Sequence, residues 1–357
     1  MNPFIRIYYL HNKVLNCIKA YGLRQFNYKP KMKKRMSQLQ GHGVVLRYLT
    51  RSQKQRIRAT YKHEHFLLEG HQLYLTVNGE FNPLIFPEDL FRTKYEAKLN
   101  DQYWANVCFE KAYFERFLPD VRFPRTILRS VEGFLYDEHF NVISHSGGRA
   151  FLSRYKEVVY KPSDAWCGQG IALLKPEDVD LEGPGNFIIQ ERIRQHIVLK
   201  SLNESSVNII RIITLLKGQE VIMLSAALRI GGKGEFTDNA STPDGLGMIV
   251  IGIDENGCLR ENGYYSCALP TKSNHDGLLF KGIQIPRFLE MIEIAKKNHP
   301  LIPKIRFIGW DFTIDENGEI IVMEINPKFP GVFYYQLANG PLFGDRTKEI
   351  YSWMKKL

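Results

Sequence analysis

The chain has 357 residues, of which 44% are hydrophobic and 24% charged, so it can bury a large core in two or three subdomains. No apolar run approaches the roughly 18 to 20 residues that a membrane-spanning helix needs. The five cysteines are scattered without a CxxC pair. Such spacing argues against a disulfide framework or a structural zinc site and fits a reducing cytoplasm.

Positive charge is concentrated at the N-terminus. Fifteen Lys and Arg residues precede the first acidic residue, Glu64, whereas the rest of the chain carries 33 basic and 38 acidic residues. The formal net charge of +10 therefore comes from the N-terminal segment. We expect residues 1–64 to form a basic, mostly helical extension.

The first 24 residues predict an amphipathic helix, and the basic cluster 29–35 follows it. Such a helix suits an anionic membrane surface, where each Lys or Arg contributes about 1 kcal/mol. The alternative is a helix packed on the body of the protein with a solvated basic face. Nucleic-acid binding is the least favoured partner, because no nucleic-acid motif accompanies the charge. The apolar positions of the helix are Ile7, Leu10, Val14, Ile18 and Tyr21.

Three segments between residues 65 and 174 have distinct patterns. Residues 72–77 form a strand-like run, and residues 101–117 predict an aromatic-rich helix that contains Lys111. In residues 158–174 a strand delivers Lys161, and a loop with Gly168 and Gly170 follows. Glycines allow backbone N–H groups to approach an anion, and a strand-borne ammonium supplies a point charge, so this segment suits a phosphate.

Two apolar strands are predicted at residues 209–216 and 221–230, joined by a Lys-Gly-Gln-Glu turn. Each holds one arginine, Arg211 and Arg229 respectively. A buried guanidinium without a partner is costly, so each arginine needs either a protein carboxylate or a ligand phosphate. Further helices are predicted at residues 287–298 and 347–357.

A β-hairpin is predicted between residues 305 and 325, with Asn317-Gly318 as a two-residue turn. Counting outward from this turn places Asp311 opposite Glu324, and Asn326 lies two residues further along the same face. Two carboxylates buried side by side repel each other unless a proton or a cation separates them. A few hard oxygen donors suit Mg²⁺ that keeps waters and phosphate oxygens as its other ligands. The alternative is a solvated hairpin face.

The spacing of Asp311, Glu324-Ile-Asn326 and Pro330-Gly331 resembles the metal-binding hairpin of ATP-grasp ligases, and most of all the sugar-transfer-associated ATP-grasp branch. The resemblance extends from about residue 98 to the C-terminus. It implies an α+β ATP-grasp fold in which two subdomains clasp the nucleotide. After the extension 1–64, we expect the N-terminal part of the body at 65–125, a small lid with Lys161 and the glycine loop at 126–190, and the C-terminal subdomain with the metal hairpin at 191–357.

The resemblance also implies roles for individual residues. Lys111 and Lys161 would contact the phosphates of ATP, and the loop with Gly168 and Gly170 would cover the triphosphate. Residues 187–193 would form the strand beside adenine. The expected nucleotide-binding residues there are Gln190, Glu191, Ile193 and, at the ribose, Gln195 or His196; the expected γ-phosphate residues are Arg229, Arg211 and Asn239; the expected metal ligands are Asp311, Glu324 and Asn326.

The resemblance further implies an ATP-dependent carboxylate–amine ligase that forms an amide through an acyl phosphate, with one or two Mg²⁺ ions, or Mn²⁺ instead. The alternative activity is an ATP-grasp phosphotransferase acting on a small molecule or sugar, and a scaffold without activity is the least favoured interpretation. The sugar-transfer branch suggests glycan-linked substrates and a role in cell-surface polysaccharide or glycoconjugate modification. We expect a cytoplasmic protein, with the basic residues 1–62 offering peripheral contact with the inner face of an anionic membrane.

Overall fold

The computed structural model describes residues 15, 18–163, 165, 168–183, 185–238 and 242–357. They divide into two compact units. The helical unit comprises residues 1–99, 267–270 and 331–357, as far as they are described, and the sheet unit comprises residues 100–266 and 271–330. The predicted boundaries at residues 64, 125 and 190 differ from this division, because residues from both ends of the chain share the core of the helical unit.

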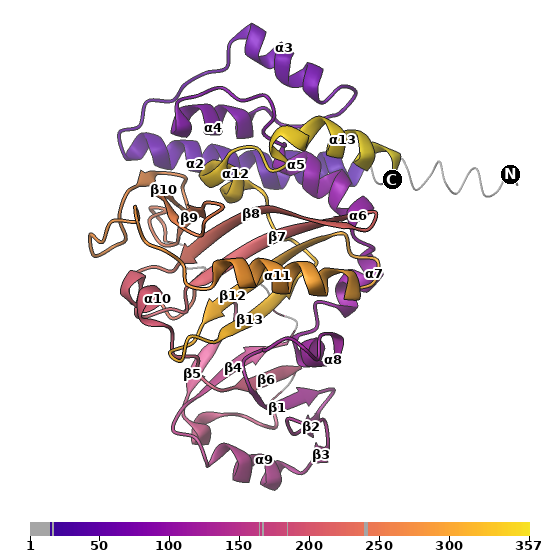
Figure 1. The fold of residues 1–357 in the computed structure, drawn as a ribbon, viewed down its shortest axis with the longest axis vertical. Helices are drawn as coiled ribbons and strands as arrows, with labels where there is room; N and C mark the ends of the chain where they lie inside the picture. Colours follow the sequence, from indigo (N-terminus) through magenta and orange to yellow (C-terminus); the bar gives the residue numbers. More distant parts are fainter. Residues whose placement is uncertain (1–14, 16–17, 164, 166–167, 184, 239–241) are drawn as a thin grey trace, which may run out of the picture. The chain divides into compact units, whose positions relative to one another are not determined.

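An aromatic cluster forms the centre of the helical unit. Tyr61 meets both Phe86 and Tyr351 edge to face, with ring centroids 5.3 Å apart in each pair, and Phe86 meets Tyr95 in the same way at 5.7 Å. The helices around it are η1 (Arg24–Tyr28), α2 (Lys29–Gly41), α3 (Arg51–Thr60), α4 (Glu69–Asn78), α5 (Glu88–Leu90), η2 (Phe91–Tyr95), α6 (Glu96–Leu99), α12 (Phe333–Asn339), η6 (Gly344–Arg346) and α13 (Thr347–Lys356). The predicted C-terminal helix is α13 (Figure 1).

The predicted N-terminal helix lies mostly outside the described residues, but residues 18–23 are helical and lead into η1 and α2. The basic cluster 29–35 therefore belongs to α2. Arg35 in this cluster is buried: its guanidinium lies 4.1 Å from the centroid of the Phe333 ring and donates a hydrogen bond to Tyr334 Oη at 2.9 Å. Lys33 and Lys34 are exposed. One face of α2 thus packs on the unit, and the other keeps its lysines in solvent.

The prediction of a strand at residues 72–77 is wrong, because these residues lie in helix α4. The helix ends at Gly79, whose φ of 78° is a left-handed conformation that glycine adopts at low cost. Leu73 and Leu75 are buried, and Asn78 donates a hydrogen bond to the Leu337 carbonyl at 3.4 Å. Packing against α12 and the glycine stop favour the helix over the β propensity of the run.

The sheet unit contains two antiparallel sheets (Figure 1). The smaller sheet has the strand order β3-β2-β1-β6-β4-β5 and spans residues 126–190, which is the predicted small subdomain. Its strands are β1 (Thr126–Val131), β2 (Phe134–Tyr136), β3 (Val142–Ile143), β4 (Val158–Pro162), β5 (Ala172–Leu174) and β6 (Phe187–Gln190). Two helices lie between these strands in the sequence, α9 (His145–Leu152) and η4 (Pro176–Asp178).

The larger sheet has the order β11-β10-β9-β8-β7-β12-β13. Its strands are β7 (Ile209–Lys217), β8 (Glu220–Ile230), β9 (Ile249–Ile253), β10 (Leu259–Tyr265), β11 (Pro270–Thr271), β12 (Phe307–Ile314) and β13 (Ile320–Asn326). Strands β7 and β8 are the two predicted arginine-bearing strands, and β12 and β13 are the predicted hairpin. The helices of this region are α10 (Ile197–Leu202), α11 (Phe288–Asn298) and η5 (His299–Leu301).

The aromatic segment 101–117 is broken rather than one continuous helix. It forms α7 (Gln102–Val107), the 3₁₀ turn η3 (Lys111–Tyr113) and α8 (Phe114–Phe117). The Glu110 carboxylate accepts a hydrogen bond from the Ala112 N–H at 3.2 Å, and the Lys111 N–H donates to the Ser163 carbonyl at 3.4 Å. These bonds begin a new helical turn at Lys111 and fix its backbone beside the end of β4.

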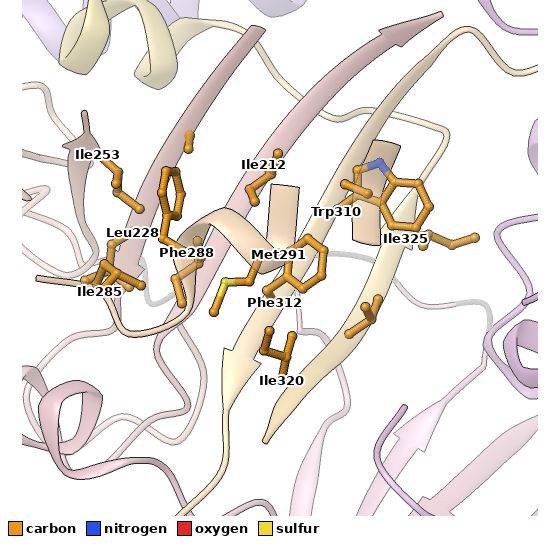
Figure 2. Packing of buried hydrophobic residues seen from close by; sticks show 14 of the residues in the cluster. Ile212, Leu228, Ile253, Ile285, Phe288, Met291, Trp310, Phe312, Ile320 and Ile325 are labelled. Carbon is orange, nitrogen blue, oxygen red and sulfur yellow. The ribbon is translucent and has the colours of Figure 1, made fainter. Parts of the chain in front are cut away.

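Helix α11 packs across one face of the larger sheet (Figures 1 and 2). Phe288 and Met291 project from it onto side chains of the strands, among them Ile212, Leu228 and Phe312, all of which are buried. Leu289, in the same helix, is 61% exposed and lies on its outer side. Every second residue of the central strands faces this core, so the residues between them face the opposite side of the sheet.

The hairpin has the predicted pairing of Asp311 with Glu324, but its turn and one of its strands differ from the prediction. Its turn is one residue longer than predicted, because the Asp315 N–H bonds to the Glu319 carbonyl at 3.0 Å and the loop is Glu316-Asn317-Gly318. A bulge at Met323 then adds one residue to β13, since Phe312 pairs with Val322 and Asp311 with Glu324. The two irregularities cancel, and Asp311 lies opposite Glu324 as predicted.

In the part of the chain that the structure describes, no helix combines the length and the apolar character required to traverse a bilayer. The described cysteines Cys108, Cys258 and Cys267 form no disulfide.

Truncating the core side of α11 should destabilise the protein far more than truncating its outer side. Met291→Ala removes a fully buried side chain, and we expect a loss of about 2–5 kcal/mol in the free energy of unfolding. Leu289→Ala in the same helix should change it by less than about 0.5 kcal/mol. Urea denaturation followed by tryptophan fluorescence measures both, and equal losses would contradict the packing of α11.

Candidate functional site

A row of charged side chains crosses the face of the larger sheet opposite α11. Asp311 on β12 pairs with Arg211 on β7 and with Glu324 on β13. Arg229 on β8 pairs with Ile209, two residues before Arg211 on the same face. Strand pairing therefore brings together, within four neighbouring strands, four of the predicted site residues.

The carboxylate of Asp311 is held by both arginines. Arg211 donates from Nε to Oδ1 and from Nη2 to Oδ2, while Arg229 Nη2 donates to Oδ2 at 3.1 Å. Asn326 Nδ2 also donates to Oδ2, at 3.2 Å. Arg229 forms a second ion pair, at 2.7 Å, with Asp238. The arginines thus meet the predicted requirement for anionic partners through protein carboxylates, and the bidentate geometry is the strong form of this contact.

Burial and these charges shift the pKa values in opposite directions. Burial alone would raise the pKa of Asp311, but Arg211 and Arg229 outweigh it and hold that pKa below its usual range. Burial raises the pKa of Asp238 despite the neighbouring Arg229. Burial likewise raises the pKa of Glu324, which the charge of Lys111 offsets only in part. Asp311 is therefore the carboxylate of the site that stays firmly ionised.

A cavity of about 510 Å³ lies over this row and is lined by residues of both sheets. Its volume falls within the roughly 300–1,000 Å³ of small-molecule sites. The predicted site residues that line it are Lys111, Lys161, Gly168, Gln190, Glu191, Ile193, Arg211, Arg229, Asp311, Glu324 and Asn326. Segments distant in the sequence therefore converge on one cavity within the sheet unit.

Two lysines reach the cavity from the side of the smaller sheet. Lys161 is carried by β4, and burial lowers its pKa to about 8, against the raising effect of Glu324. Lys111 Nζ donates to the Ala165 carbonyl at 2.7 Å and lies 3.8 Å from Glu324 Oε1. Two partly buried ammonium groups that line one cavity favour the binding of an anionic ligand.

Gln190 lies at the end of β6. Its backbone takes part in strand pairing, whereas its side chain does not. Its backbone pairs with Thr126 on one side and Val159 on the other, and the Glu191 N–H donates to the Arg125 carbonyl at 3.0 Å. Gln190 Nε2 donates to the Pro124 carbonyl at 3.2 Å, whereas its Oε1 is buried without a hydrogen-bond partner among the described residues. This amide oxygen is a polar atom that a ligand can satisfy.

Some predicted residues lie elsewhere. His196 is not among the described residues that line the cavity, because its Nδ1 accepts from the Val198 N–H and caps α10. Gln195 lines the cavity, but its side-chain amide is bonded to the loop before β7. Its Nε2 donates to the Ser206 carbonyl, and its Oε1 accepts from the Asn208 N–H. Asn239 lies outside the described residues. Gly170 does not line the cavity; it has φ of 72°, and an added Cβ would lie 2.8 Å from Pro162.

Several residues of the cavity were not expected from the sequence. Asp238 binds Arg229, and the only signal for it was the need of a buried arginine for an anion. Lys328 and Phe329 also line the cavity, and Phe329 has φ of 51°, a costly conformation for an aromatic residue. They occupy the segment between Asn326 and Pro330, which directly follows β13.

The donor set fits a hard divalent cation. Asp311, Glu324 and Asn326 offer carboxylate and amide oxygens from adjacent strands, which is the ligand chemistry that Mg²⁺ prefers when phosphates complete its coordination. No cluster of three His, Cys, Asp or Glu side chains suitable for a metal was found among the described residues, so a metal held entirely by such groups is not indicated there. The set is a partial one that needs a ligand's oxygens.

Comparison with known families identifies this region. Residues 179–352, just under half of the chain, match the model of the family described as sugar-transfer associated ATP-grasp. Over these residues the chain is similar to that family. The matched segment contains the two arginine-bearing strands and the hairpin of β12 and β13. No curated protein matches the sequence.

The chain is also similar to several solved structures. The ATP-grasp ligase PsnB complexed with a minimal precursor is 14% identical, with a TM-score of 0.41 over 72% of this chain and 63% of that one. D-alanyl-alanine synthetase A from Vibrio cholerae is 10% identical, with a TM-score of 0.43 over 70% and 64%. VanG D-Ala:D-Ser ligase from Enterococcus faecalis is 13% identical, with a TM-score of 0.43 over 72% and 64%. The match thus spans less than two thirds of each of these chains.

Lys161 should make nucleotide affinity depend on pH. The charged ammonium attracts phosphate, and in the free protein its pKa is about 8. Above pH 8 binding must restore the proton, so we expect the affinity for AMP-PNP to fall by up to about tenfold per pH unit. Lys161→Arg, which stays charged, should remove this dependence. Calorimetric titrations between pH 7 and 9.5 measure it, and a flat wild-type profile would refute the role of Lys161.

Proposed function

We propose that the protein is an ATP- and Mg²⁺-dependent ligase that joins a carboxylate to an amine through an acyl phosphate. The observation that carries this proposal is the cavity itself. In it the cations Lys111, Lys161, Arg211 and Arg229 accompany the paired acidic residues Asp311 and Glu324. Positive groups for phosphates and oxygen ligands for a cation are what phosphoryl transfer requires of a protein.

The cavity supports one orientation of ATP. The unpaired Oε1 of Gln190 can accept a hydrogen bond from the amino group of adenine, with Ile193 lining the same cavity. Lys111 and Lys161 then serve the phosphates, and Arg211 and Arg229 the terminal one. Asp311, Glu324 and Asn326 would hold one or two Mg²⁺ ions, with Mn²⁺ as a substitute, and the bound metal would neutralise part of the phosphate charge.

The reaction needs no protein nucleophile. A substrate carboxylate oxygen attacks the γ-phosphorus in line, the bond to the bridging oxygen breaks, and ADP leaves. Arg211 and Arg229 offset the charge on the transferring phosphoryl group. The amine then attacks the carbonyl carbon of the acyl phosphate, phosphate departs, and the amine loses a proton to give the amide. The protein contributes alignment and fixed positive charge.

The substrates are proposed from the family and from the relatives. The sugar-transfer association favours a glycan, a uronic acid or an amino sugar as one partner, and hence a role in cell-surface polysaccharide or glycoconjugate modification. The similar solved structures include a D-Ala:D-Ser ligase and a ligase complexed with a precursor peptide, so amino acids and peptides are the second class to assay. A phosphotransferase that stops after transferring phosphate is the alternative.

Hydroxylamine distinguishes these activities. With Mg²⁺, ATP and a panel of uronic and amino acids, a ligase should yield a hydroxamate because hydroxylamine traps the acyl phosphate. Glu324→Gln should lower this rate about 100-fold or more, because a ligand of the cation is lost. Glu319→Gln is the matched control, since Glu319 is an exposed carboxylate in the turn of the same hairpin, and it should retain full activity.

A stable phosphoester in place of the hydroxamate would indicate the phosphotransferase. Full activity of Glu324→Gln would contradict the metal assignment. Asp311→Asn is a less clean test of the metal, because it also leaves two buried guanidinium groups without their shared anion and so threatens the fold.

We also propose a cytoplasmic location with peripheral contact to anionic lipid. The outer face of the N-terminal helices supports it, since Phe26 is 84% exposed and Lys19, Lys33 and Lys34 are exposed as well. Helix α3 adds further exposed basic residues and contains no acidic one: Arg51, Lys54, Arg56 and Arg58. Apolar and basic side chains on one exposed surface are typical of interfacial helices.

Sedimentation with lipid vesicles tests this contact. Lys33→Gln combined with Lys34→Gln should lower partitioning onto phosphatidylserine vesicles about 30-fold, since each lysine contributes about 1 kcal/mol. The control pair Lys296→Gln and Lys297→Gln removes two adjacent lysines at the end of α11 and should change nothing. Equal binding of the wild type to neutral phosphatidylcholine vesicles would exclude an electrostatic contact.

A further inference from the structure

Both oxygens of the Asp311 carboxylate are engaged by protein donors. Arg211 binds both of them, and Arg229 and Asn326 add bonds of 3.1 and 3.2 Å to Oδ2. An oxygen has two lone pairs, so three donors use the capacity of Oδ2, while Oδ1 accepts from Arg211 Nε. A cation that entered now would find this proposed ligand occupied and two guanidinium groups beside it.

Glu324, the neighbouring acidic ligand, is held differently. Its ion pair with Lys111 is 3.8 Å long, and its side chain is 27% exposed, against 4% for Asp311. The two arginines therefore bind only one of the acidic metal ligands proposed here, Asp311, and not Glu324. The remaining ligands, Glu324 and Asn326, are too few to bind a hydrated divalent cation well by themselves.

We propose that Arg211 and Arg229 withhold Asp311 from the divalent cation until an anion takes their place. In this proposal, which rests on the proposed nucleotide site, the terminal phosphate draws the guanidinium groups away and releases the carboxylate. The protein alone then binds the cation weakly, and the nucleotide and the cation bind with strong mutual dependence. Arg211 and Arg229 act here as positioning residues for Asp311.

The surroundings of Asp311 would allow the arginines to exchange this carboxylate for a phosphate. Buried arginines need an anion when no ligand is bound, and Asp311 supplies it. Arg229 has a second carboxylate, Asp238, at 2.7 Å, so it can leave Asp311 without losing every anionic neighbour. Asn326 now donates its amide nitrogen to Asp311, and rotation of that amide would present its oxygen to a cation instead.

The test uses Mn²⁺ alone, without nucleotide, and measures the bound ion by electron paramagnetic resonance. Arg211→Gln should tighten Mn²⁺ binding about tenfold by releasing Asp311, a larger gain than the loss of one nearby positive charge gives by itself. Arg211→Gln combined with Asp311→Asn should return it to the wild-type level. Arg192→Gln removes an exposed arginine from the same cavity, one that pairs with Glu157, and should change the affinity less than twofold.

Two further variants protect the test against misfolding. Arg229→Gln removes the 3.1 Å contact to Asp311 together with the ion pair to Asp238, leaves the two bonds from Arg211 in place, and should also tighten Mn²⁺ binding. Arg211→Lys keeps the charge without the planar fork and should give an intermediate affinity. Circular dichroism confirms that each variant is folded before it is compared.

The outcomes separate this inference from the proposed function. If the wild type binds Mn²⁺ as tightly as Arg211→Gln and Asp311→Asn abolishes that binding, the withholding is overturned and the metal site remains. An equal gain in Arg192→Gln and Arg211→Gln would show a general charge effect and also overturn it. If no form binds Mn²⁺, even with AMP-PNP present, both the inference and the metal assignment fail.

Discussion

The site depends on the register of one strand. Because β12 lies between β7 and β13, Asp311 meets Arg211 on one side and Glu324 on the other. A shift by one residue would turn Asp311 into the core beneath α11 and bring Trp310 or Phe312 to the cavity, since side chains alternate along a strand. The apolar face of the sheet therefore fixes the polar face.

The charged face has two functions that draw on the same groups. In the protein alone, Asp311 neutralises Arg211 and Arg229, which could not otherwise be buried. The same groups have the chemistry to bind phosphate and metal. A site whose charges already balance internally is stable without its ligand, and the ligand then competes with protein contacts instead of filling an unpaired set of charges.

Much of this arrangement follows from sequence pattern. The arginine strands, the hairpin and the strand bearing Lys161 all have periodic apolar residues, and the structure places them where the pattern predicts. The turn of the hairpin was not predictable in this way. The Asp315 side chain accepts hydrogen bonds from the Asn317 and Glu319 N–H groups, which stabilises a longer loop than Asn-Gly suggests, and the bulge at Met323 restores the pairing. The pairing was thus predicted correctly from an incorrect turn.

Other features needed tertiary information. The role of Asp238 depends on where its loop meets β8, and no local pattern in the sequence specifies that. The break at Lys111 depends on the Ser163 carbonyl, which is 52 residues away in the sequence. The helix α4 has a strand-like composition and depends on burial against residues near the C-terminus. In each case a distant contact outweighs the local preference.

The helical unit is built from both ends of the chain, and this has a consequence for synthesis. Gln336 binds both backbone groups of Phe86, at 2.7 and 2.9 Å, and Tyr351 contacts Tyr61. A ribosome makes residues 1–99 well before residues 331–357, so the early helices lack these partners until the later residues have been synthesised. The residues of the sheet unit are made in between. The core that the first helices begin is therefore completed only when α12 and α13 pack against them.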